Sequence, residues 1–125
     1  MRKARDFFIG FDPRTFEDYI AAMTGPQSAY VRMVVSYWEQ ACALLNYGLL
    51  HEDLFFETSG EFFGIWERIK PTIEAGRKQF SSKIYLAHLE KAAKRYESWI
   101  EQRSPGNLAA MRKMMEQMRP KSKVA

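Results

Sequence analysis

The stretch that decides the fold is QSAYVRMVVSYWEQACALLNY, residues 27–47. Its apolar residues recur every three or four positions, as on one face of a helix. The only charged residues are Arg32 and Glu39, which are seven positions apart and therefore share a face. So little charge over this length predicts a central, largely enclosed helix. Its predicted core face comprises Val31, Val34, Val35, Trp38, Ala41, Cys42 and Leu45.

Working outward, the neighbouring segments also have helical spacing, and no run alternates as a half-buried strand does. Asp12-Pro13 is a helix start signal, and Gly25-Pro26 ends that helix. Gly48 suits the position after the central helix, where a left-handed backbone is favourable for glycine. A helix that begins at Ser59 should kink or break near Lys70, because Pro71 follows.

Two more helices are expected in the second half of the chain. One spans residues 82–103, and the last follows the break at Ser104–Asn107. A chain of 125 residues has the size of a single domain. We therefore expect one all-α domain over residues 1–125, an irregular bundle of four or five helices with short connections. Residues 1–11 are expected to form an N-terminal arm and residues 119–125 a frayed tail.

Composition limits the setting in which the chain works. The single cysteine, Cys42, excludes an internal disulfide and lies in an apolar run, so we expect a buried free thiol. No segment has the roughly 20 apolar residues of a membrane span, and the apolar run after the basic start is too short for a signal peptide. These features indicate a soluble, cytoplasmic protein.

Charge is divided unevenly along the chain. Residues 1–66 contain five Lys and Arg against nine Asp and Glu, whereas residues 67–125 contain fourteen against six. The basic half would suit nucleic acid or another anionic surface. Solvated helix faces explain the same excess, and binding of nucleic acid is the less favoured interpretation.

The sequence His51-Glu52-Asp53 is the one place that resembles a chemical site. A zinc-protease helix needs a second histidine four residues on, but that position holds Phe55. A di-iron bundle needs Glu-x-x-His pairs, and the chain has none. Acidic residues in a first helical turn oppose the helix dipole. We therefore expect His51 to start a short helix, and we assign no catalytic, cofactor-binding or metal-binding residues.

The longest recognisable motif runs from residue 37 to 77, YWEQACALLNYGLLHEDLFFETSGEFFGIWERIKPTIEAGR. Its recurring features are aromatic, turn and charged residues in a fixed order: Trp38-Glu39, Gly48, Asp53-Leu54-Phe55, Trp66, Pro71 and Arg77. This order resembles an uncharacterised bacterial family of small all-helical domains of unknown function. The resemblance implies a helical fold and brings no catalytic residue with it. Beside Glu39, a pairing cation could come from Arg32, from Arg77 or from another basic residue.

The final helix, in NLAAMRKMMEQMRPK, contains a methionine-rich stripe. Its members are spaced three, four and three residues apart, a seam that suits a facing helix, and they are Leu108, Met111, Met115 and Met118. The stripe could pack on its own domain or on a partner. Flexible thioether side chains are common at adaptable binding surfaces. We therefore predict a homodimer with this stripe as a possible partner-binding surface.

The sequence favours a non-catalytic helical interaction or structural module over two alternatives. The first alternative is an anionic-surface or nucleic-acid binder that uses the basic half. The second is an enzyme with an unrecognised site near His51. No cofactor is expected under the favoured interpretation.

Overall fold

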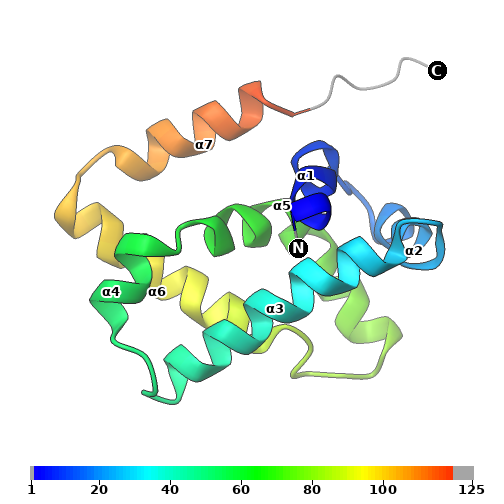
Figure 1. Ribbon diagram of the computed structural model, residues 1–125, viewed down its shortest axis with the longest axis horizontal. Coiled ribbons are helices and arrows are strands. Elements are labelled where there is room, and N and C mark those ends of the chain that lie inside the picture. The colour runs from blue at the N-terminus through cyan, green and yellow to red at the C-terminus, as the bar shows by residue number, and fades with distance from the viewer. Residues whose placement is uncertain (1, 120–125) are drawn as a thin grey trace.

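The computed structural model describes residues 2–119, which form seven α-helices and no strand (Figure 1). The all-α prediction is confirmed, but four or five helices was an undercount. A short helix at His51 was expected, whereas residues 1–11 were expected to form an arm, so α1 is the helix that was not predicted. The helices are α1 (Arg2–Gly10), α2 (Phe16–Thr24), α3 (Ser28–Asn46), α4 (Glu52–Thr58), α5 (Glu61–Gln79), α6 (Ala87–Arg103) and α7 (Asn107–Gln117).

Residues 1–11 were expected to form an arm, but residues 2–10 form helix α1. Ala4 and Phe8 of this helix are buried, and α1 packs against α3. Arg5 adds a bidentate contact to Glu61, with Nε at 2.9 Å from Oε2. A helix this short is marginal by itself, and the burial of Phe8 stabilises it. Of the predicted tail, residues 120–125 lie outside the described part of the chain.

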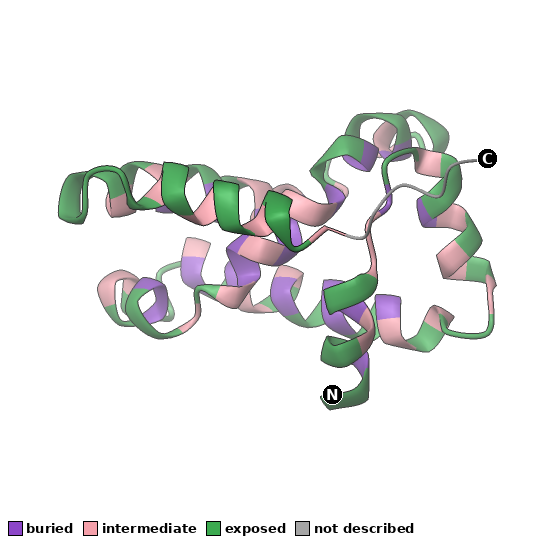
Figure 2. Ribbon diagram, turned by 90° about the horizontal axis from the view of Figure 1, so that it is seen from above, coloured by how far each residue is buried: buried purple, intermediate pink, exposed green. Residues whose placement is uncertain are grey.

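Helix α3 crosses the front of the molecule in Figure 1 and packs against α1, α2 and α6. It begins and ends within a residue of the predicted bounds, and Gly48 has the expected positive φ of 80°. Trp38 and Trp66 are both buried in one core that draws on α1 to α6. Buried residues, purple in Figure 2, lie where the helices face one another.

Two helix starts differ from the prediction. Helix α2 begins after Thr15, because the Thr15 hydroxyl accepts a hydrogen bond from Asp18 N while the Asp18 carboxylate accepts one from Thr15 N. This reciprocal pair is a stronger start signal than Asp12-Pro13. Helix α6 begins at Ala87 and not at residue 82, since Leu86 takes a left-handed conformation with φ 53°.

Of the kink or break predicted near Lys70, the break does not occur, since α5 continues through Pro71. Buried side chains on both sides of the proline, Ile69 and Ile73, hold the two parts of the helix on the core. The Thr72 hydroxyl donates to the Ile69 carbonyl at 2.7 Å. Packing therefore outweighs the lost backbone hydrogen bond at this position.

Glu39 has a different role from the one expected. Its carboxylate accepts hydrogen bonds from the backbone N–H groups of Leu89 at 2.7 Å and His88 at 3.3 Å. These groups open helix α6, and a negative charge there also opposes the helix dipole. Glu39 therefore caps α6 from α3, and the described residues place neither Arg32 nor Arg77 in an ion pair with it.

Candidate interaction surface

Helix α3 has a second apolar face, opposite the one that enters the core. Four large side chains on it, Met33, Tyr37, Leu44 and Tyr47, are between 40% and 76% exposed. Gln40 lies among them and is also exposed. We call these five residues the α3 seam. Contiguous exposed apolar side chains of this kind commonly mark an interaction site.

The spacing of the α3 seam is regular. Its residues follow one another at intervals of four, three, four and three, the pattern by which one helix meets another along a coiled-coil interface. From Met33 to Tyr47 the seam is about 21 Å long at 1.5 Å per residue. No seam residue is charged. A neighbouring helix could therefore lie along it without burying an unpaired charge.

The residues beside the α3 seam are small. On one flank they are Ala29, Ser36 and Ala43, and the first two are exposed. Short side chains let the backbone of a second helix approach to the 8–10 Å that is typical of packed helices. The seam is therefore accessible as well as apolar.

The low charge of residues 27–47 predicts an enclosed helix and therefore does not indicate this exposed surface. Only one face of α3 is enclosed. The available signal was the presence of apolar residues on both sides of the helix, since a helix buried on one face normally has polar residues on the other.

The methionine-rich stripe of α7 is less exposed than the α3 seam. Leu108, Met111 and Met115 are partly buried against the chain's own core. Met118 is 57% exposed, and Met114 beside the stripe is 55% exposed. Helix α7 has no buried residue (Figure 2), so it rests on the domain without entering it.

Ion pairs hold α7 in this position. Arg112 contacts Glu67 of α5 at 2.6 Å and Glu97 of α6 at 3.0 Å. Its guanidinium carbon also lies 5.7 Å from the centre of the Phe63 ring. Because Arg112 lies between Met111 and Met115, these contacts direct the stripe toward the chain's own helices.

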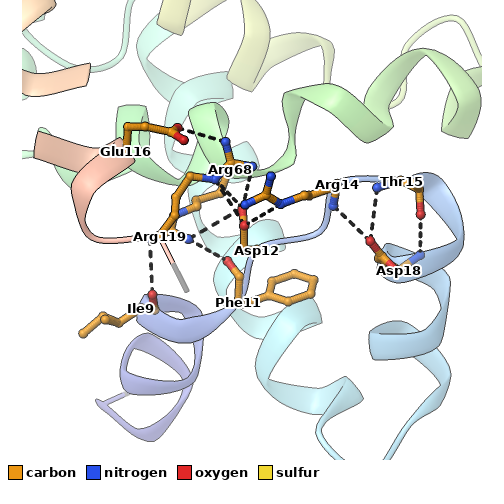
Figure 3. A network of polar contacts seen from close by, with 9 residues as sticks. All are labelled: Ile9, Phe11, Asp12, Arg14, Thr15, Asp18, Arg68, Glu116 and Arg119. Carbon is orange, nitrogen blue, oxygen red and sulfur yellow. Dashed lines mark hydrogen bonds and ion pairs between the residues drawn. The ribbon is translucent and has the colours of Figure 1, made fainter. Parts of the chain in front are cut away.

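A polar network closes the other end of α7 (Figure 3). The Asp12 carboxylate receives hydrogen bonds from Arg119 at 3.0 and 3.1 Å and from Arg14 at 3.1 Å. Arg68 lies 3.9 Å from the same carboxylate and donates to the carbonyls of Phe11 and Ile9. Burial alone would raise the pKa of Asp12, but Arg119 and Arg14 outweigh it and hold that pKa below its ordinary value.

This network borders a cavity of about 230 Å³ between α5, α7 and the segment before α2. Its cationic side chains, Arg68, Lys70, Arg112 and Arg119, each lie in an ion pair with an acidic residue of the chain. A ligand in this cavity would therefore meet only cations that are already neutralised by acidic residues of the chain. We interpret it as a structural joint.

Ion pairs within the fold also join the acidic first half of the chain to its basic second half. Acidic residues of the first half pair with basic residues of the second: Asp12 with Arg119, Glu52 with Arg95, and Asp53 with Arg103. The cations that gave the second half its charge are thus partly neutralised in the fold.

The His51 segment forms a helix start, as predicted. His51 Nδ1 accepts from Leu54 N at 3.3 Å, which caps α4. Asp53 accepts from Trp99 Nε1 at 2.9 Å and from Arg103 at 2.8 Å, and these contacts lower the pKa of its carboxyl. The acids beside His51 therefore fasten α4 to α6.

The thiol and the possible metal ligands of the described residues give neither an exposed nucleophile nor a metal site. Cys42 is a buried free thiol, as expected, and burial raises its pKa to about 12. Over residues 2–119, His, Cys, Asp and Glu side chains nowhere form a group of three that could hold a metal ion. In the same range, no helix combines the length and apolar character needed to cross a membrane.

A family model described as a domain of unknown function, DUF4760, matches residues 1–96. The chain belongs to this family. No curated protein and no solved structure matches the chain. The matched DUF4760 region contains the whole α3 seam, whereas helix α7 lies beyond it. The seam therefore lies within the matched region, and the α7 stripe lies outside it.

Proposed function

We propose that this DUF4760 protein is a non-catalytic interaction module that binds an amphipathic helix along the α3 seam. The observation that carries the proposal is the uncharged row of exposed apolar side chains at coiled-coil spacing. The expected occupant is a helix with an apolar face of similar length, because the spacing of the seam is the one by which two helices pack, and about fourteen helical residues span 21 Å.

The chemistry of the remaining surface supports this choice over catalysis. The cations around the cavity between α5 and α7 are paired within the chain. His51 is engaged in capping, and the Cys42 thiol stays protonated. An enzyme would need an activated nucleophile or a free acid–base pair in a cleft. A reducing compartment such as the cytoplasm would suit the single thiol.

Nucleic-acid binding is the second candidate, and it rests on the net charge of +4. The ion pairs between the two halves argue against a continuous basic face. Binding to phosphates would weaken steeply as salt rises. A helix bound to the uncharged α3 seam should instead respond little to salt, so salt dependence separates the two candidates.

Photo-crosslinking tests the interaction module. A benzophenone amino acid is placed at Tyr37 in the seam, and at Ile84 as a control that is even more exposed but lies outside it. After expression in the native host, we expect protein adducts from position 37 and none of the same mass from position 84. The adducts should disappear when Leu44→Lys places a charge in the seam.

Two results would count against the module. The first is a set of adducts common to both positions, which would indicate non-specific contact. The second is the absence of any protein adduct at position 37. Circular dichroism of Leu44→Lys serves as the folding control, and because Leu44 is exposed, we expect its helix content and melting temperature to match those of the unsubstituted chain.

A further inference from the structure

The α3 seam has features that identify its partner more closely, and this step rests on the proposed function above. We propose that the partner is a second copy of this chain, whose own α3 lies antiparallel against the seam. In the proposed register Met33 faces Leu44 of the second copy, and Tyr37 faces Gln40 of the second copy. The two-fold axis then passes between residues 38 and 39.

Polar matching selects this register. Gln40 has an amide that must be hydrogen-bonded once a partner covers it, because an unsatisfied buried amide is costly. The other antiparallel register with regular seam layers places Gln40 against Leu44 of the second copy and leaves the amide without a partner. In the proposed register the Tyr37 hydroxyl is the polar group that faces it. Met33 and Leu44 then form an apolar layer on each side of the polar one, and Tyr47 lies beyond the paired stretch.

Symmetry makes an identical chain a suitable occupant. In a two-fold interface the same patch serves both copies, so each Tyr37–Gln40 contact occurs twice. Like charges are the usual obstacle to self-pairing, and the α3 seam contains none. Antiparallel helices also oppose their dipoles favourably. The small residues Ala29, Ser36 and Ala43 beside the seam permit close approach of the second helix.

The size of the contact sets its expected strength. The two seams overlap from Met33 to Leu44, about 16 Å, and such a contact forms an interface smaller than the roughly 1,200–2,000 Å² of stable complexes. We therefore expect a dissociation constant at or above about a micromolar. Light scattering at a few hundred micromolar should accordingly approach twice the 14.6 kDa mass of one chain.

Disulfide trapping tests orientation and register together. Residues 33 and 44 of one chain are about 16 Å apart along the helix, too far for an internal disulfide, which needs Cα atoms within about 7 Å. In the proposed dimer, the double variant Met33→Cys, Leu44→Cys brings each new thiol opposite the other residue of the second copy. We expect a covalent dimer on a non-reducing gel. The buried, protonated Cys42 should not interfere.

The single variants are the matched controls. Met33→Cys alone and Leu44→Cys alone each place their thiols about 16 Å apart in the antiparallel dimer, so neither should crosslink. Crosslinking of both singles would indicate parallel helices and overturn the proposal. A dimer by mass whose double variant does not crosslink would overturn the register.

Mass measurement of surface variants completes the test. Tyr37→Lys should give a monomer, whereas Met118→Lys, at the exposed end of the α7 stripe, should leave the dimer unchanged. Loss of the dimer in Met118→Lys alone would assign self-association to α7 and overturn the proposal. A monomeric unsubstituted chain would also overturn it. The interaction module would survive that result if position 37 still crosslinked a different protein.

Discussion

The single Nε–H of Arg119 is shared between the two carboxylate oxygens of Asp12, at 3.0 and 3.1 Å, across 107 residues of sequence. The contact joins the end of α7 to the segment between α1 and α2, and the Asp12 side chain is only 9% exposed. Together with Arg112, this pair positions a helix that has no buried residue. Ion pairs, and not burial alone, therefore hold the last helix of the described chain.

Replacement of Asp12 by asparagine should reveal this joint through its pH dependence. The folded-state pKa of Asp12 is lowered, so its stabilising contribution is fully present above the ordinary value near 3.9. That contribution is lost as pH falls through the folded-state pKa. We expect Asp12→Asn to lower the free energy of unfolding by about 1–2 kcal/mol at pH 7. Urea titrations should show the difference shrinking below about pH 4, whereas a pH-independent difference would contradict the assignment.

Removal of the Glu39 carboxylate should weaken the start of α6. Glu39→Ala leaves the N–H groups of His88 and Leu89 without their acceptor, at a cost of about 1.5–3 kcal/mol for hydrogen bonds to a charged group. Glu39→Gln retains one acceptor oxygen and should lose less. Amide hydrogen exchange at Leu89 measures the local effect. Unchanged protection in Glu39→Ala would show that α6 does not depend on this cap.

The buried tryptophans should dominate the stability of the core. Trp38→Ala and Trp66→Ala should each cost roughly 3–5 kcal/mol through lost burial and cavity formation. Trp38→Phe should cost less, because Trp38 Nε1 has no hydrogen-bond partner within the described structure. His51→Ala, at an exposed cap, should cost about 1 kcal/mol or less. Thermal melts compare the four variants, and wild-type-like melting of Trp38→Ala would contradict the assigned core face.

Cys42 should behave as an inert thiol in the native protein. With a pKa of about 12, only roughly one molecule in ten thousand carries a thiolate at pH 8, and the thiolate is the reactive form. We expect Ellman's reagent to label Cys42 only after unfolding in urea. Labelling of the native chain at the rate of the denatured chain would show that α3 opens to solvent.

Sequence alone determined the elements whose signals are local. The buried face of α3 and its end at Gly48 follow from apolar spacing and from the conformational freedom of glycine, and both were predicted correctly. The start of α4 at His51 was also predictable, because capping and first-turn acids act within a few residues. These are short-range effects, so nearby residues suffice to specify them.

Only the tertiary structure decided the features that join distant segments. The capping of α6 by Glu39, the passage of α5 through Pro71 and the contact between Asp12 and Arg119 each depend on groups brought together by packing. The same holds for the surface. Spacing alone did not show that Met115 would face the chain's own core while Tyr37 remained exposed, because periodicity identifies an apolar face without identifying what covers it.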